Sequence, residues 1–137
     1  MKNLIIFFLF TNIIYSQYDV PITLLNQFNG KYDFTIIGNT QNEFDNYQNP
    51  PPPCQMLTQS SATLNLLSTQ NIVAAYFIWS GIGNGQNANI ELNGNLITAD
   101  QINVADVSPI EGFFTYFSSS KNITTYVQSY GNGTYSV

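Results

Sequence analysis

The sequence contains no histidine and only one cysteine, and these absences exclude most hydrolases and the zinc sites built on histidine. Without histidine, a Ser-His-Asp triad, a Cys-His pair and a histidine-based zinc site are all excluded. With Cys54 alone, no disulfide can close within the chain, so stability has to come from packing or from bound ions. Cys54 follows four prolines and would need another base to act as a nucleophile, so we interpret it as a loop or partly buried thiol.

Charged residues are also scarce, at 8% of the chain, and none of them is arginine. Beyond residue 16 the cations are Lys31 and Lys121, against eight carboxylates. Nucleic acid and anionic membrane surfaces both require clustered basic residues, so neither is an expected partner. Asn, Gln, Ser and Thr supply the polarity instead. Such a surface suits neutral hydrogen-bonding ligands, sugars included, although the same residues also simply decorate the strands and turns of extracellular β proteins.

Residues 1–16 have the parts of a secretory signal peptide. Lys2 provides the charged start, residues 4–14 contain an apolar stretch too short to span ~30 Å of hydrocarbon, and Ser16 is the small residue before the expected cleavage point. The polar residues that follow give no stop-transfer pattern, so no membrane insertion is expected after cleavage. We expect a secreted protein, extracellular or on the cell surface, with one domain at 17–137.

Hydrophobic patterning predicts short strands along most of the chain. Residues 22–28 and 31–37 are β-rich runs separated by Asn29-Gly30, a dipeptide preferred in type I′ hairpin turns, and we expect them to pair. A long exposed polar loop is expected at 38–56. The later elements are a strand at 62–66, a strand at 72–79, a turn at 81–85, a hairpin of 88–92 with 95–98 around Asn93-Gly94, and a strand at 113–117. The apolar runs 72–79 and 113–117 predict buried strands, the first covered on both faces.

The last part of the chain predicts one short helix. Asn122 can cap it, Ile123 and Val127 are spaced at i, i+4, and Gly131 would end it, with an edge strand as the alternative. Some seven short strands without long helical periodicity favour an all-β fold, an antiparallel β-sandwich. Because residues 134–137 look like a strand that has just begun, we expect the sandwich to be incomplete at its C-terminus.

Paired carboxylates could in principle serve a catalytic site in this chain. A glycosidase would need an acid and a base flanking one bond, and the candidate pairs are Asp100 with Asp106 and Glu43 with Asp45, although the spacing selects neither. Glu43 and Asp45, with neighbouring amide and backbone oxygens, could also bind calcium. The glycines at 81–85 are not followed by lysine, so we interpret them as a turn and not as a phosphate loop.

Two predicted loops carry residues suited to recognition of a neutral surface ligand. In loops 38–56 and 81–87, tyrosine could stack on a sugar face while asparagine amides bind hydroxyl groups. The candidate ligand-binding residues are Asn42, Asn46, Tyr47, Asn84 and Asn87.

Several segments, taken in order, resemble the N-terminal region of large secreted surface proteins of gliding and related Bacteroidota, flavobacteria among them. These segments are FNGKYDFT (28–35), IGNT (37–40), PC (53–54), SSATL (60–64), AAYFIWSG (74–81) and GNGTY (131–135). The resemblance implies a multidomain adhesin-like protein associated with gliding motility and type IX secretion, and it carries over no catalytic residue. Residues 90–94 and 122–127 also resemble segments of jelly-roll sugar-binding modules.

We therefore expect a non-enzymatic, jelly-roll-like β-sandwich that forms one module of a larger cell-surface adhesin and binds glycan or surface ligands. Calcium is the one cofactor for which the sequence offers ligands. The alternatives from other classes are a carbohydrate-processing enzyme that uses Asp100 and Asp106, and a purely structural spacer domain.

Overall fold

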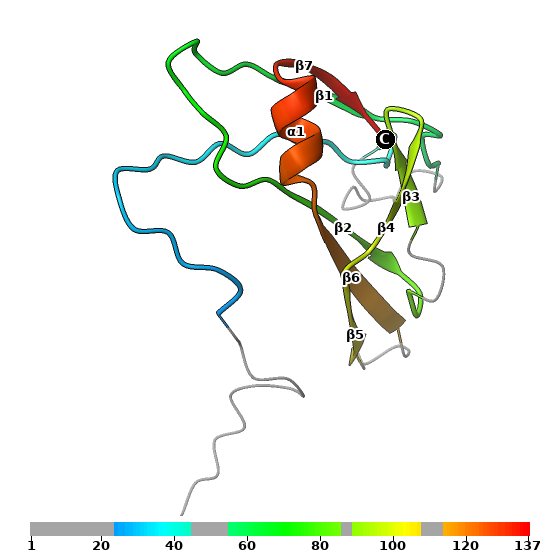
Figure 1. Cartoon of the computed structure of the whole chain (residues 1–137). Coiled ribbons are helices and arrows are strands. Elements are labelled where there is room, and N and C mark those ends of the chain that lie inside the picture. The colour runs from blue at the N-terminus through cyan, green and yellow to red at the C-terminus, as the bar shows by residue number, and fades with distance from the viewer. Residues whose placement is uncertain (1–23, 45–54, 86–88, 108–113) are drawn as a thin grey trace, which may run out of the picture. The chain divides into compact units, whose positions relative to one another are not determined.

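The computed structural model describes residues 24–44, 55–85, 89–107 and 114–137, shown in colour in Figure 1. The chain divides into two units, one ending at Phe34 and the other running from Thr35 to Val137. Within the described residues, the second unit holds seven strands and one helix, and every paired strand is antiparallel to its neighbour. The expected all-β antiparallel class is confirmed.

The strands form three separate sheets (Figure 1). The first pairs β1 (Ser61–Leu64) with β7 (Gly133–Ser136), and the second is the hairpin of β3 (Asn89–Leu92) and β4 (Asn95–Thr98). The third has the order β2-β6-β5, with β2 at Tyr76–Ile82, β6 at Phe114–Asn122 and β5 at Gln101–Val107. These sheets are not closed on one another, so the expected jelly-roll sandwich is not confirmed.

The core lies between the β1–β7 pair, the β3–β4 hairpin and the helix. Its buried side chains are Leu64, Leu92, Val127 and Tyr135, one from each of β1, β3, the helix and β7. Phe77 at the start of β2 and Ile97 of β4 pack against this cluster from the side. The core therefore joins elements that are far apart in the sequence.

The predicted hairpin is confirmed over Asn89–Thr98, and its turn has the predicted chemistry. Asn93 and Gly94 adopt φ angles of 50° and 76°, as a type I′ turn requires. Asn93 also ties the hairpin to the rest of the unit, because its backbone N–H donates to the Ser136 carbonyl at 2.8 Å and its Oδ1 accepts from the Ser136 N–H at 2.7 Å. Its Nδ2 donates to the Tyr126 hydroxyl at 3.1 Å.

The predicted helix is confirmed as α1 (Thr124–Tyr130). The N-cap position is Ile123 and not the predicted Asn122, whose Oδ1 accepts from the backbone N–H and the hydroxyl of Thr124 at 3.0 Å and 2.7 Å. The helix ends at Gly131, with φ of 74°. Among the described residues, no helix is long and apolar enough to cross a membrane.

The expected hairpin of 22–28 with 31–37 is wrong for the part that the structure describes. Residues 24–37 form no strand, although the Phe28 and Tyr32 rings approach edge to face across Asn29-Gly30, with centroids 6.1 Å apart. Phe34 and Ile36 are each 84% exposed. A two-stranded hairpin is marginal in water unless a further layer covers its apolar face, and alternation alone does not supply that layer.

The strand predicted at 72–79 lies further along the chain and is not covered on both faces. The backbone N–H and C=O of Ala75 bond to Thr124 and Ile123 at the start of α1, so pairing begins only at Tyr76. Among the described strands, β2 lies at the edge of its sheet, and its Ile78 and Ile82 are 66% and 68% exposed.

Three further elements differ from expectation or were missed. Gly81 belongs to β2 and not to the predicted turn, and it faces Phe117, whose ring lies 2.9 Å from where a Cβ would stand. The strand predicted at 113–117 is β6, which continues to Asn122 and leaves Phe114 about half exposed, so it is not a buried strand. β5 was not predicted at all. By contrast, the strand predicted at 62–66 is present as β1, which ends two residues earlier at Leu64, and the extended end at 134–137 is present as β7.

Candidate functional site

The described carboxylates include one firm ion pair, which holds Asp100 beside β6. The Lys121 Nζ donates to one Asp100 oxygen at 2.5 Å, and the backbone N–H of Asn122 donates to the other at 3.0 Å. These two contacts, first the one from Lys121, lower the pKa of the Asp100 carboxyl below its usual 3.8. Asp100 is thus held ionised, a state suited to fixing β5 against β6 and not to donating a proton.

The pair of Asp100 and Asp106 cannot act on one glycosidic bond. Asp106 lies near the far end of β5, where it accepts from the Thr115 hydroxyl at 2.7 Å, while the backbone of Asp100 is paired with Ser120. Six residues of extended chain separate the two Cα atoms by about 20 Å, and the short aspartate side chains cannot close that gap. Glycosidases need about 5–10 Å between their carboxylates, so this prediction of a catalytic pair is wrong.

The second carboxylate pair and the calcium candidates lie around the 38–56 loop. Glu43 is exposed, and its backbone N–H donates to the Gln55 carbonyl at 3.1 Å, while Asp45 lies outside the described residues. Within the described ranges, no group of three His, Cys, Asp or Glu side chains is placed to hold a metal ion. The calcium site stays a prediction.

The asparagines and the tyrosine predicted to bind ligand are only partly described. Asn42 forms an isolated bridge with Met56 that closes the base of the 38–56 loop, and its backbone N–H donates to the Thr40 hydroxyl at 3.0 Å. Asn84 is exposed in the turn after β2. The other three predicted residues, Asn46, Tyr47 and Asn87, lie outside the described residues, as does Cys54.

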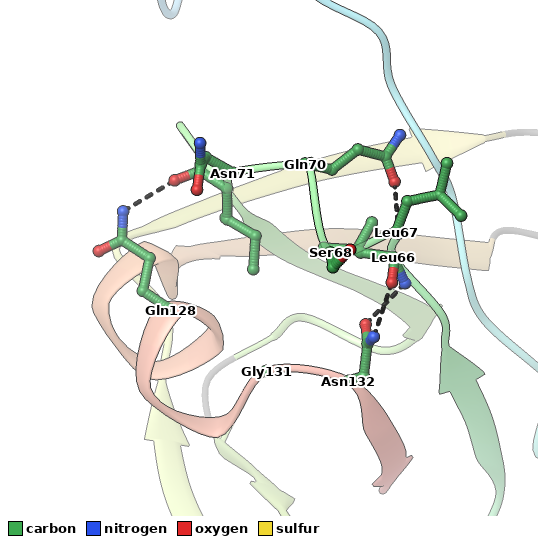
Figure 2. Close-up of a pocket in the computed structure, with 9 residues that line it drawn as sticks. Leu66, Leu67, Ser68, Gln70, Asn71, Gln128, Gly131 and Asn132 are labelled. Atoms are coloured by element: carbon green, nitrogen blue, oxygen red, sulfur yellow. Dashed lines mark hydrogen bonds between the residues drawn. The ribbon is translucent and has the colours of Figure 1, made fainter.

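A hollow of about 560 Å³ lies elsewhere, between the segment after β1 and the end of α1 (Figure 2). It is lined by residues 66–68 and 70–72 of the segment after β1, and on the opposite wall by Gln128, Gly131 and Asn132 at the end of α1 and just after it. Among the residues that the structure describes, the lining contains four carboxamide side chains and three aliphatic ones, but no charged and no aromatic side chain. Sequence reasoning missed this site, because its two walls are some sixty residues apart in the chain.

Side-chain amides hold the two walls together. The Asn132 Oδ1 accepts from the backbone N–H of Leu66 at 2.6 Å, and its Nδ2 donates to the Leu66 carbonyl at 2.8 Å. This carboxamide therefore bonds to both backbone polar groups of one residue, as a neighbouring strand would, and it continues the β1–β7 pairing past Gly133. Gln128 adds a bond from its Nε2 to the Ile72 carbonyl at 2.9 Å.

The turn that carries Asn132 is itself fixed by two tyrosines. The Tyr135 hydroxyl donates to the Gly131 carbonyl at 2.7 Å, and the Tyr130 hydroxyl donates to the Thr134 carbonyl at 3.1 Å. The two rings meet edge to face with centroids 5.0 Å apart. Burial raises the pKa of the Tyr135 hydroxyl, which keeps this donor protonated at neutral pH.

Other polar groups in the hollow are left for a ligand. The Gln70 Oε1 accepts from the Leu67 N–H at 2.8 Å, but its Nε2 makes no hydrogen bond to the described residues, and neither do the Gln128 Oε1 and the Asn71 carboxamide. Figure 2 shows Asn71 and Gln128 on one side of the hollow and Gln70 on the other. The hollow thus offers donors and acceptors together, without formal charge.

Comparison with protein-family models, with curated proteins and with solved structures finds no match to this chain. Its function therefore has to be inferred from the geometry and chemistry of the described residues.

Proposed function

We propose that this chain is a secreted, non-catalytic module of a cell-surface adhesin and that it binds a neutral, hydrogen-bonding ligand, a glycan, in the hollow of Figure 2. The observation that carries this proposal is the lining, in which Gln70, Asn71 and Gln128 have unused amide atoms beside aliphatic walls and no charged group. Neutral sugars present hydroxyl donors and acceptors on an apolar frame, which is the matching chemistry.

The absence of charge from the lining decides between ligand classes. An ionic ligand would meet no opposite charge in the described lining of the hollow. A neutral polyol exchanges its bonds to water for bonds to amides at little cost, with a modest net gain for each hydrogen bond. Weak, repeated binding of this kind suits adhesion, in which many copies on one surface act together.

Secretion and membership of a larger surface protein are parts of the same proposal. They rest on the signal-peptide pattern at 1–16 and on the resemblance of segments 28–135 to N-terminal regions of adhesin-like proteins linked to gliding and type IX secretion. A jelly-roll-like sandwich also belongs to the proposal. It is supported by the antiparallel pairing of the strands and by the exposed Ile78 and Ile82 on the open β2-β6-β5 sheet, which a further layer would cover.

The experiment that tests the proposal is a glycan array probed with the fluorescently labelled full chain. The informative variant is Asn71→Ala, since the Asn71 side chain is exposed and makes no hydrogen bond to the described residues, so its loss should leave the fold intact. The matched control is Asn103→Ala, an exposed asparagine on β5 outside the hollow. We expect saturable binding that weakens about three- to tenfold in Asn71→Ala and is unchanged in Asn103→Ala.

Two results would contradict the proposal. An array without saturable binding would leave the chain a structural spacer. Binding that Asn71→Ala and Asn103→Ala weaken equally would place the ligand outside the hollow.

A further inference from the structure

Strand β2 has one edge that the described part of the chain does not use. It stands first in the sheet order β2-β6-β5, so β6 covers only its inner edge (Figure 1). Just after β2, the Gly83 N–H donates to the Thr115 carbonyl at 2.7 Å, and just before it, the Ala75 carbonyl accepts from the Ile123 N–H at 3.0 Å. Only alternate residues of an antiparallel strand bond to a given neighbour, so the odd-numbered residues of β2 face β6. The backbone groups of the even-numbered residues therefore point away from the sheet.

The outward groups of β2 include those of Ile78, Ser80 and Ile82, and all three residues are exposed. Among the described residues, none forms a hydrogen bond to the backbone of these three. Natural sheets protect a free edge with lysine, with proline or with a bulge. Over Tyr76–Ile82 the strand has no charged residue and no proline, and its register with β6 is unbroken. Nothing in this edge therefore opposes pairing with a further strand.

The outer edge of β2 is complementary to itself. When a second copy lies antiparallel about a twofold axis at Ser80, the two Ser80 residues face one another, and Ile78 of each copy faces Ile82 of the other. All three are outward residues, so each facing pair can exchange two hydrogen bonds. Their side chains share one face of the sheet, so the isoleucines also meet across the new ladder. A register shifted by two residues sets isoleucine against serine and loses these apolar pairs.

Charge favours contact between two copies at β2 and not at β5. The chain has a net charge of -5, so two copies repel one another least where their contact is free of carboxylates. The edge of β2 meets this condition. At the outer edge of β5, the same construction about Val104 sets the Asp106 carboxylate opposite Ile102. With only one self-pairing edge the assembly closes as a dimer, whereas two such edges would extend it into a filament.

We propose that two copies of this chain associate edge to edge through β2, about a twofold axis at Ser80, and join their three-stranded sheets into one. This inference is independent of the glycan proposal, because no residue that lines the hollow lies on β2. An edge of seven residues is about 23 Å long. Such a contact falls below the ~1,200 Å² at which stable interfaces begin, so the dimer should be reversible, with a dissociation constant on the order of 10–100 μM.

The test is sedimentation velocity of the full chain at concentrations on both sides of this dissociation constant. We expect a reversible equilibrium between monomer and dimer. Ser80→Lys places two like charges face to face at the axis and should weaken dimerisation at least about tenfold. The matched control is Asn103→Lys, which adds the same charge at an exposed position of β5 in the same row of the sheet, since Ser80 and Asn103 both pair with Ser118. It should leave the dimer unchanged.

A second variant separates loss of contact from loss of folding. Ser80→Glu should also stay monomeric, but an equal mixture of Ser80→Lys and Ser80→Glu chains sets opposite charges at the axis and should restore the dimer to within about threefold of the wild-type affinity. A mixture that stays monomeric would overturn the proposal. Equal weakening by Ser80→Lys and Asn103→Lys would overturn it as well. A wild-type chain that is monomeric at every concentration would overturn it and leave the edge to a strand from a different protein.

Discussion

Replacement of Asn93 should separate the two roles that this residue has in the fold. It occupies a left-handed conformation, with φ of 50°, and its side chain bonds to the Ser136 N–H at 2.7 Å and to the Tyr126 hydroxyl at 3.1 Å. Asn93→Gly removes the side-chain bonds but accepts the backbone angle. Asn93→Ala removes the same bonds and also strains the backbone.

The expected magnitudes follow from these contacts. Two partly buried hydrogen bonds at about 1 kcal/mol each give a loss of ~2 kcal/mol in the free energy of unfolding for Asn93→Gly. A left-handed alanine adds about 1 kcal/mol, so Asn93→Ala should lose ~3 kcal/mol. For a chain of this length, the thermal unfolding midpoint should fall by roughly 8 °C in Asn93→Gly and by roughly 12 °C in Asn93→Ala.

Urea unfolding of the two variants, followed by near-UV circular dichroism, checks this reasoning. Asn103→Ala on β5 serves as the control for loss of an exposed asparagine. Equal stability of the glycine and alanine variants would mean that the left-handed angle carries no strain. A loss below about 0.5 kcal/mol in both would refute the claim that Asn93 joins the hairpin to β7 and α1.

Two further predictions concern single side chains. Lys121 lowers the pKa of the Asp100 carboxyl, so the ion pair stabilises the folded chain above pH 3.8 and loses this effect as the pH falls through the lower folded-state pKa. Carbon-detected NMR titration of Asp100 should therefore give a midpoint below 3.8, and this midpoint should rise in Lys121→Met. A midpoint that does not move in Lys121→Met would contradict the pairing. Ser119 is 1% exposed, and its hydroxyl has no hydrogen-bond partner among the described residues. Ser119→Ala should therefore raise the free energy of unfolding, measured by urea unfolding, by up to about 1 kcal/mol. A decrease of that size would show that the hydroxyl is bonded.

Local turn signals in the sequence predicted a hairpin correctly only where the residues beside the turn are also buried against the core. The same dipeptide, Asn-Gly, predicted hairpins at residues 29–30 and 93–94, and only the second is present. The difference is packing: Leu92 is 2% exposed against the core, whereas Phe34 has no such cover. Turn chemistry permits a hairpin, and a buried face stabilises it.

The sequence failed to predict β5 and the hollow for different reasons. β5 carries a period-2 signal, with Ile102 and Val104 alternating with polar or small residues, and closer attention to it could have identified the strand. The hollow has no comparable signal. Its walls meet because Asn132 binds the backbone of Leu66, a contact that no local pattern encodes, and its amides are indistinguishable by sequence from those on any exposed turn.

The central claim is that a neutral glycan binds in the hollow, and amide NMR of the full chain titrated with the strongest array ligand tests it most directly. The account predicts that the side-chain NH₂ signals of Gln70, Asn71 and Gln128 shift together with saturation, while those of Asn42 and Asn84 stay unmoved. Shifts confined to Asn42 and Asn84 would contradict it and return the site to the loops that the sequence alone indicated.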